Sequence, residues 1–335
     1  MNADTPAWIA DQTRNLLAQR GHAWLLSGPA GLGQYALALG LVKAWLCETP
    51  DANGACGQCG SCHAIEVRTH ADLCVLMPET WMLELGWPLS EKAQADLDDK
   101  KRKPSKEIRI EAMRDAVDFS QRTSARGRGK AVLVYPAEDM NVFTANALLK
   151  TLEEPPGDVR FVLASEAAHQ LLPTLRSRCL VHSMAWPEAL DSLAWLEAQG
   201  LDAETAAVAL RAQGGRPLAA LHWAHAGHDP AHWAALPQAL ARGDVHPLRD
   251  WTPQQVLGVQ QQLCHDLLAM AVQAEPRFFH KKDLRLQVPL SVLSQWGLAL
   301  QAHRRTMDHP YNPGLFIEAL VAQAQAVLAQ GRSPT

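Results

Sequence analysis

A glycine-rich segment, GPAGLGQY at residues 28–35, stands between a short apolar run and a stretch with helical periodicity at residues 35–46. A strand, a glycine loop and a helix in this order form a P-loop, whose backbone N–H groups approach phosphates at the helix N-terminus. A working P-loop continues with a Lys for the phosphates and a Ser or Thr hydroxyl for Mg²⁺. This chain has Gln34 and Tyr35 there, so we expect a loop that forms but binds ATP poorly and hardly hydrolyses it. The glycines of the loop are Gly28, Gly31 and Gly33.

A second apolar run, AVLVY at residues 131–135, is uninterrupted and contains β-branched side chains, which is typical of a buried parallel strand. In P-loop ATPases such a strand ends in acidic residues that hold Mg²⁺ and polarise water. Here the strand ends in Tyr135 and Pro136, and the first acids after it are Glu138 and Asp139. A glycine-rich turn by itself also fits a purely structural role. Losses in both halves of the site favour a nucleotide-binding module that has become inactive.

Length and composition set the broad class of the protein. The 335 residues leave room for two or three domains, and 47% hydrophobic with 20% charged residues is an ordinary soluble composition. The net charge of −4 gives no positive field for autonomous nucleic-acid binding. We find no apolar run long enough to span a membrane and no signal-peptide pattern at the N-terminus, so the expected location is the cytoplasm.

Four of the seven cysteines form a cluster with the spacing C-x8-C-x2-C-x2-C. Thiols clustered in this way in a reducing compartment indicate a metal site rather than disulfides. Four thiolates that leave no open position suit a structural, tetrahedral Zn²⁺ ion, which would staple an excursion from the first helix and take no part in catalysis. A reduced, metal-free loop and a redox pair are the alternatives, and His63 could replace one thiol. The four cysteines are Cys47, Cys56, Cys59 and Cys62.

Hydrophobic periodicity divides the chain into an N-terminal α/β part and a C-terminal helical part. From Trp8 to Cys179, short apolar runs alternate with helical patterns, which predicts a parallel α/β sheet. The expected strands are 23–27, 73–77, 131–135 and 160–164. Beyond Pro187 the patterns are helical, and we expect no strand after residue 230. The expected helices there are 190–199, 203–213, 217–226, 253–274, 290–307 and 312–330.

Two stretches are rich in basic side chains. The first, residues 78–108, carries Lys100, Lys101, Arg102 and Lys103 among several acids, which is typical of a solvated loop or a frayed helix. Contact with nucleic acid is the alternative for this stretch. The second is a glycine-containing loop before the strand at 131–135, and its cations could touch a phosphate backbone. These cations are Arg122, Arg126, Arg128 and Lys130.

The segment NALLKTLEEPP at residues 146–156 is an amphipathic helix that two prolines stop, and an expected strand and the sequence RSRC at residues 176–179 follow it. This pattern resembles the clamp-loader branch of the AAA+ superfamily, to which the gamma/tau and delta prime subunits of DNA polymerase III belong. The resemblance extends to the P-loop position, the four-cysteine excursion and the helical part, so it covers essentially the whole chain. It implies an AAA+ P-loop domain with a zinc-binding insertion at 1–184, a small helical lid at 185–229 and an all-helical collar domain for oligomerisation at 230–335.

Within that branch the losses at the nucleotide site favour delta prime, the non-hydrolysing member, over gamma/tau, which keeps the Lys, the Ser or Thr and an Asp-Glu pair. The rings of this branch bind ATP at subunit junctions. The resemblance implies that Arg178 of the Ser177-Arg178-Cys179 motif reaches the neighbour's ATP as an arginine finger, although a salt bridge that closes the turn also explains the residue. Arg216 and Ser165 lie at positions that resemble sensor 2 and sensor 1. Because no nucleotide is expected in this chain, Arg216 fits a structural lid residue better.

The resemblance also implies partners and cofactors. The partners are gamma/tau ATPase subunits and a delta subunit in a hetero-oligomeric ring, with the sliding clamp and primer–template DNA contacted through the complex and no membrane. The chain would belong to the DNA polymerase III holoenzyme, a nucleotidyltransferase, and would bind structural Zn²⁺ but no ATP. Two other functions stay open. A gamma/tau-like ATPase could use Glu138 or Asp139 as its acid, and a zinc-dependent nucleic-acid-binding protein would fit the cysteines but not the acidic net charge.

Overall fold

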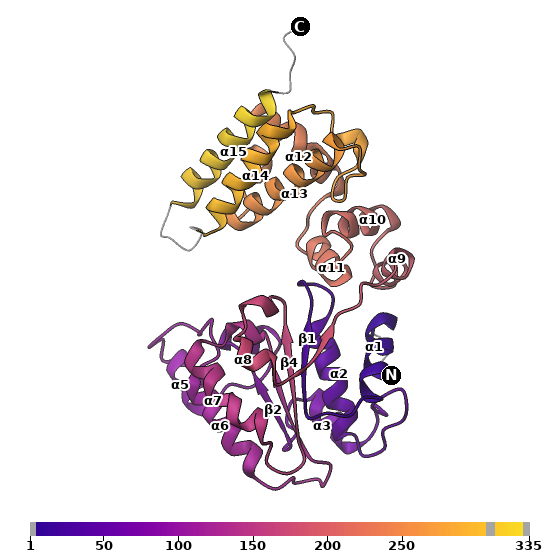
Figure 1. The fold of residues 1–335 in the computed structure, drawn as a ribbon, viewed down its shortest axis with the longest axis vertical. Coiled ribbons are helices and arrows are strands. Elements are labelled where there is room, and N and C mark those ends of the chain that lie inside the picture. Colours follow the sequence, from indigo (N-terminus) through magenta and orange to yellow (C-terminus); the bar gives the residue numbers. More distant parts are fainter. Residues whose placement is uncertain (1–4, 306–311, 331–335) are drawn as a thin grey trace. The chain divides into compact units, whose positions relative to one another are not determined.

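The computed structural model of the protein describes residues 5–305 and 312–330. The chain forms two compact units, Met1–Pro187 and Glu188–Thr335, which can be followed along the colour bar of Figure 1. The division after Pro187 lies near the predicted domain boundary at residue 184. The predicted boundary between a lid and a collar at residue 229 stays a prediction.

Five parallel strands form the sheet of the N-terminal unit, in the order β2-β3-β4-β1-β5. The four expected strands are confirmed, with small shifts at their ends. Sequence reasoning missed the fifth strand, because it is short, largely exposed and ends in polar side chains. The strands are β1 Ala23–Ser27, β2 Leu73–Leu76, β3 Lys130–Val134, β4 Val159–Ser165 and β5 Leu180–Ser183.

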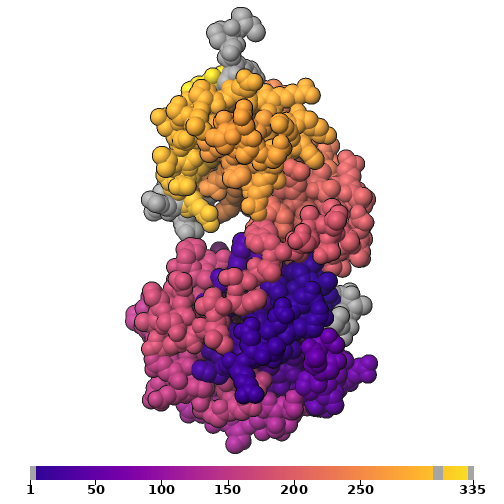
Figure 2. Space-filling model, turned by 45° about the vertical axis from the view of Figure 1, so that its right-hand side comes forward, coloured from indigo at the N-terminus to yellow at the C-terminus, as the bar shows by residue number. Residues whose placement is uncertain are grey.

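Helices cover both faces of this sheet, with α2 and α3 on one side and α6 and α7 on the other (Figure 1). Fully buried apolar side chains such as Val132, Leu148 and Leu163 join strands and helices into one core. The space-filling view shows the indigo atoms of the first helices as a continuous part of the surface of this unit (Figure 2). The helices are α1 Ala7–Leu17, α2 Gln34–Leu46, α3 Gly60–Glu66, α4 Glu79–Glu84, α5 Glu91–Asp98, α6 Ile110–Gln121, α7 Val142–Glu153 and α8 Pro173–Arg176.

The charged stretch at residues 78–108 is more ordered than a solvated loop. It contains α4 and α5, and the carboxylate of Glu79 is buried between them and the end of the stretch. Arg102 makes an ion pair with this carboxylate, so only the three lysines of the basic run are solvated as expected. The frayed-helix interpretation fits α5, which buries none of its residues.

Helices and the loops between them make up the described residues of the second unit, and no strand occurs in 230–305 or 312–330, as expected. The expected helices are confirmed, except that Met307 lies outside the described residues. One apolar core, which includes Trp233, Trp296 and Phe279, is shared by helices from α9 to α15. Among the described residues no helix is both long and apolar enough to cross a membrane. The helices are α9 Ala189–Ala198, α10 Ala203–Ala212, α11 Pro217–His225, α12 Pro230–Arg242, α13 Pro253–Ala271, α14 Leu290–Arg305 and α15 Pro313–Ala329.

Candidate functional site

The predicted P-loop lies between β1 and α2, at the carboxyl edge of the sheet, where parallel α/β sheets place their ligand sites. Gly31 and Gly33 have φ values of 88° and 100°, a left-handed backbone conformation that residues other than glycine rarely adopt. Gly28 is needed for a different reason, since a Cβ atom there would lie 2.8 Å from the Cβ of Met184. The backbone N–H of Gly28 also donates to the carbonyl of Ser165 (3.3 Å). The glycines therefore have the geometry of a P-loop.

Gln34 occupies the phosphate-binding position of the loop and is almost fully buried, with 2% of its surface exposed. Its amide Nε2 donates to the carbonyl oxygens of Gly28 (2.6 Å) and Pro29 (2.8 Å). A Lys at this position would present a cation to the β- and γ-phosphates. The Gln34 amide is neutral, and its N–H groups are already bonded to the loop itself. The side chain thus stabilises the loop in place of a ligand.

Two tyrosines meet where a P-loop ATPase holds Mg²⁺. Tyr35 is the second residue of α2 and Tyr135 follows β3, and their rings lie 5.4 Å apart between centroids. The Tyr35 hydroxyl accepts a hydrogen bond from Nε1 of Trp87 (2.7 Å), and the Tyr135 hydroxyl donates to Oε1 of Glu166 (2.9 Å). Burial raises the pKa of both phenols, so both stay neutral at physiological pH. A neutral phenol is a poor substitute for the small alcohol and carboxylate ligands of Mg²⁺.

The acids that follow β3 lie in a short 3₁₀ turn, Ala137–Asp139. Oε1 of Glu138 accepts the backbone N–H of Glu166 (2.8 Å), so this carboxylate stabilises the turn after β4. Burial, followed by the charges of Glu138, Glu166 and Glu107, raises the pKa of Asp139 to about 6. Like charges thus surround the two acids that a divergent ATPase would need.

The four predicted metal ligands come together around one centre. Their sulfur atoms all lie within 4.8 Å of one another, with 3.8 Å between Cys47 and Cys59 and 3.9 Å between Cys56 and Cys62. A tetrahedron with metal–sulfur bonds of about 2.3 Å has sulfurs roughly 3.8 Å apart. Disulfides would need about 2.05 Å, and all seven cysteines are free thiols. The cluster is therefore spaced to hold a metal ion, and His63, which is exposed, is outside it.

Backbone amides donate hydrogen bonds to three of the four sulfurs. The N–H groups of Cys56, Cys59 and Cys62 donate to the sulfurs of Cys47, Cys56 and Cys59, at 3.3 to 3.4 Å. The Thr49 hydroxyl, together with the amides of Gln58 and Cys59, lowers the pKa of Cys56 to about 6. A thiolate is the form that binds a metal. These contacts lie around the start of α3, whose N-cap is Cys59.

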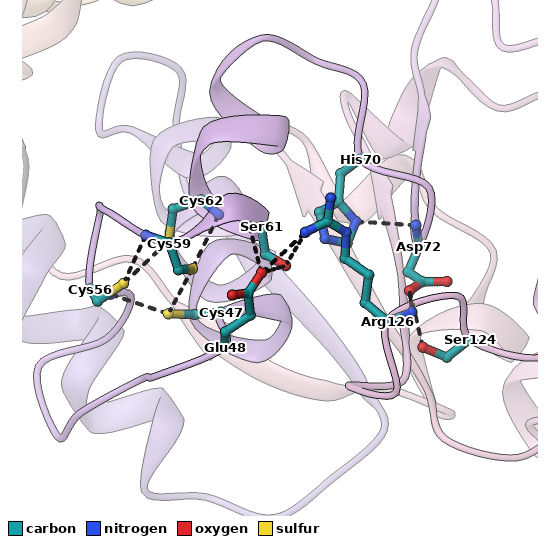
Figure 3. Close-up of polar contacts among 10 residues, drawn as sticks. All are labelled: Cys47, Glu48, Cys56, Cys59, Ser61, Cys62, His70, Asp72, Ser124 and Arg126. Atoms are coloured by element: carbon teal, nitrogen blue, oxygen red, sulfur yellow. Dashed lines mark hydrogen bonds and ion pairs between the residues drawn. The ribbon is translucent and has the colours of Figure 1, made fainter.

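A chain of polar contacts joins the cysteine cluster to the basic loop that precedes β3 (Figure 3). Glu48, next to Cys47, accepts from the N–H (2.9 Å) and hydroxyl (3.0 Å) of Ser61 and from Nη1 of Arg126 (3.1 Å). The fully buried Asp72 accepts from the N–H of Arg126 (2.9 Å). Arg126 therefore ties the loop to the cluster.

Of the predicted phosphate-contacting cations, two have structural partners. Nζ of Lys130 lies 3.3 Å from Asp72 and 3.9 Å from the ring centre of Phe119. Arg126 is bound by Glu48, as described above. Arg122, Arg126 and Arg128 are all exposed, but Arg126 is held by its ion pair, which leaves Arg122 and Arg128 as the candidates for phosphate contact. Phosphate contact by these two stays a prediction.

The Ser-Arg-Cys motif forms a closed turn after α8. Arg178 donates through Nε to Oε1 of Glu153 (2.6 Å), contacts the same oxygen through Nη2, and donates through Nη1 to the carbonyl of Thr174 (2.6 Å). Ser177 donates to the same carbonyl (3.1 Å), and burial raises the pKa of the Cys179 thiol to about 12. Arg178 thus makes a salt bridge within the chain, although 29% of its side chain is exposed.

The two sensor-like residues also have partners within the chain. Ser165, fully buried at the end of β4, accepts the N–H of Ala167 (3.2 Å) through its hydroxyl. Arg216 donates through Nε to the carbonyl of Gln213 (2.7 Å) at the start of α11. Both contacts stabilise local turns. A nucleotide-sensing role for either residue stays a prediction.

Comparison with known proteins identifies relatives over most of the chain. A family model described as "DNA polymerase III, delta subunit" matches residues 11–187. DNA polymerase III subunit delta' of Pseudomonas aeruginosa is 35% identical over 327 residues, which cover 91% of this chain and 92% of the relative. The subunit delta' of Escherichia coli is 33% identical over 73% of this chain and 67% of its own. The tau subunit of E. coli matches a shorter part, with 35% identity over 48% of this chain and 21% of its own length.

The solved structures show the same fold. A gamma subunit-related protein of Thermotoga maritima superimposes with a TM-score of 0.50 at 16% identity, over 96% of this chain and 99% of the other. At this identity the similarity concerns the fold alone. It confirms the expected α/β fold.

Proposed function

The chain belongs to the DNA polymerase III delta prime family, and from this premise we propose that it is the non-hydrolysing subunit of a clamp loader. The observation that carries the proposal is the closed P-loop, in which Gln34 binds the loop's own carbonyls and the ring of Tyr35 packs against that of Tyr135. Neither a phosphate-binding cation nor a small Mg²⁺ ligand is available there. Gamma/tau and delta subunits are the proposed ring partners, and the sliding clamp and primer–template DNA would be contacted through the ring.

Nucleotide binding tests the inactive site directly. A fluorescent ATP analogue with Mg²⁺ is titrated against the purified, metal-loaded chain. We expect no saturable binding into the high micromolar range. Tight, Mg²⁺-dependent binding would instead support a gamma/tau-like ATPase with a divergent site.

Arg178 is the residue that we assign to the neighbouring subunit's ATP. In the free chain it is bound to Glu153, and both side chains are partly exposed. A surface ion pair of this kind contributes about 1 kcal/mol or less. An arginine finger supplied in trans accelerates phosphoryl transfer by roughly 10³- to 10⁵-fold, equivalent to about 4 kcal/mol or more. Losing the Glu153 contact therefore costs little beside the stabilisation that Arg178 would give the transition state.

Replacing Arg178 with Ala in a reconstituted clamp loader tests this assignment. ATP turnover at the adjoining site should fall by roughly 10³-fold, and clamp loading should slow, while the ring still assembles. The exposed neighbour Arg176, replaced by Ala, is the matched control and should leave turnover unchanged. Size-exclusion chromatography measures assembly. Normal turnover in the Arg178→Ala ring would contradict the assignment of Arg178 as an arginine finger.

The cysteine cluster is proposed to hold structural Zn²⁺. Four thiolates fill a tetrahedral shell, which leaves no position for a substrate or a catalytic water. The reducing cytoplasm, which we propose as the location, keeps such thiols available. The metal would fix the segment that carries Cys47 and Glu48, and through Glu48 the loop that carries Arg126.

A further inference from the structure

Two tryptophans from the charged stretch cover the two tyrosines of the P-loop region. Trp81 meets the ring of Tyr135 edge-on, with centroids 5.6 Å apart. Trp87, which is 7% exposed, donates its indole N–H to the hydroxyl of Tyr35 at 2.7 Å. We call residues 78–109 the insert, and these four side chains the aromatic cluster. The cluster joins the insert to the start of α2 and to the end of β3.

A single buried carboxylate gathers the two ends of the insert. Glu79 is 8% exposed and pairs with Arg102 and with Nε of Arg109 (3.5 Å), and it accepts the N–H of Ser105 (2.8 Å). Burial alone would raise the pKa of Glu79, but the hydrogen bond from Arg102 and the amide of Ser105 outweigh it and lower the pKa. The carboxylate is therefore charged and holds α4 against the end of the insert.

The far end of the insert is fixed to the segment that follows β3. The N–H of Ile108 donates to the carbonyl of Asp139 (3.0 Å), and Ile108 is fully buried. On the other side, the guanidinium of Arg68 lies 5.7 Å from the ring centre of Trp87. The tryptophans are thus carried by a braced segment rather than by a free loop.

We propose that the insert is a built-in occupant of the Mg²⁺ side of the nucleotide site, which supports the empty P-loop and closes it to nucleotide. The proposal rests on the proposed function, in which the site stays free of ATP. Gln34 stands where a Lys would supply the cation that binds phosphate, and the aromatic cluster fills the region that Mg²⁺ would need. Trp81 and Trp87 are large aromatic side chains, which typically bury roughly 150–250 Å² each. A nucleotide could therefore enter only by displacing them.

Hydrogen exchange of the full chain tests the supporting role. Trp87→Phe keeps an aromatic ring, although a smaller one, and removes the donor to Tyr35, whereas Tyr35→Phe removes the acceptor. Each variant should speed exchange of the amides at residues 37–40 by roughly ten-fold, because the start of α2, where the N–H of Leu37 donates to the carbonyl of Gly33, loses a contact that closes it. The double variant should add nothing further, since both changes delete the same bond. Trp251→Phe, in the second unit, is the control.

The outcomes of this exchange experiment are decisive in both directions. Faster exchange in both single variants with no added effect in the double variant supports the proposal. Unchanged protection of residues 37–40, or additive effects of the two changes, would overturn it. Trp87→Phe and Tyr35→Phe are conservative, so thermal unfolding can confirm that all variants fold.

Nucleotide binding tests the closing role. Gln34→Lys restores the cation, and we compare this variant with and without Trp81→Ala and Trp87→Ala, using a fluorescent ATP analogue with Mg²⁺. The opened triple variant should bind at least about ten-fold more tightly than Gln34→Lys alone. Equal affinities, whether weak or tight, would overturn the proposal. Tight binding by the unaltered chain would instead contradict the proposed function, so the two failures are distinguishable.

Discussion

At the scale of single residues, the carboxyl of Asp139 lies among other acids, so its charge is unfavourable. Burial first, and then Glu138, Glu166 and Glu107, raises its pKa from an ordinary value of 3.8 to about 6. A fold that raises the pKa of an acid stabilises its neutral form. The stabilisation is complete below pH 3.8 and is lost as pH rises to about 6. Above that pH the ionised carboxylate destabilises the N-terminal unit.

Replacing Asp139 with Asn should therefore stabilise the unit at neutral and alkaline pH. A pKa difference of about two units corresponds to roughly 3 kcal/mol, but the side chain is partly exposed and solvent screening reduces the gain to about 1 kcal/mol. The melting temperature should rise by about 2–4 °C at pH 8. The gain should shrink as pH falls below about 6 and vanish near pH 4. Differential scanning calorimetry across this pH range measures it.

The exposed Asp118, replaced by Asn, is the control for this experiment. It removes a carboxylate from α6 without changing a buried environment. With a raised pKa, Asp139 is already neutral at pH 4, as Asn is, so the substitution should then have no effect. A gain as large at pH 4 as at pH 8 would therefore contradict the raised pKa.

At the scale of elements, the loop before β3 is organised by Asp72, which precedes β2. The buried carboxylate accepts from the N–H groups of Ala125 (2.7 Å) and Arg126 (2.9 Å) and from the hydroxyl of Ser124 (3.0 Å). Burial would raise the pKa of Asp72, but the hydrogen bonds, led by the two amides, outweigh it and lower the pKa. The buried Lys130 balances its charge.

Asp72→Ala should destabilise the unit by about 3–5 kcal/mol, because it leaves the ammonium of Lys130 buried without its counter-ion. Urea unfolding gives the free energy. Asp72→Ala combined with Lys130→Met should recover part of the loss, since no buried charge then remains. Asp51→Ala, at an exposed aspartate, is the control. A loss of less than about 1 kcal/mol for Asp72→Ala would mean that water solvates Lys130 in the folded protein.

Local patterns predicted most elements of the fold. The apolar runs at β1 and β3 and the glycines Gly31 and Gly33 have short-range signals, because strand burial and left-handed φ angles depend on adjacent residues. The spacing of the four cysteines likewise predicted their convergence, since Cys56, Cys59 and Cys62 lie close together in the sequence. The motifs carried the family assignment for the same reason.

The contacts that close the nucleotide site could not be predicted in this way. Trp87 and Tyr35 are 52 positions apart, and no periodicity relates them. Glu79 reads as one acid in a charged stretch, yet it is buried because Arg102 and Ser105 converge on it. The partner of Arg178 is Glu153, 25 positions away, so the sequence could not decide between a salt bridge and a free finger. Long-range pairing of this kind follows only from the tertiary fold.

At the scale of the whole molecule, each compact unit has a core of its own. The apolar core of the sheet domain contains Leu163 and Val134, and that of the helical unit contains Trp296 and Leu263. The cysteine cluster and its contacts lie entirely in the first unit. A change at the metal site should therefore affect the two units differently.

Removing the metal tests whether the two units respond differently. A chelator should release about one Zn²⁺ per chain, which atomic absorption measures, and amides of residues 47–62 should then exchange faster. Because Glu48 binds Arg126, the loop at 122–130 should also loosen, whereas residues 188–305 and 312–330 should keep their protection. Cys59→Ser should reproduce the effect and Cys74→Ser, outside the cluster, should retain the metal. Equal loosening of both units would contradict a purely local staple and would make the metal a requirement for the fold of the entire chain.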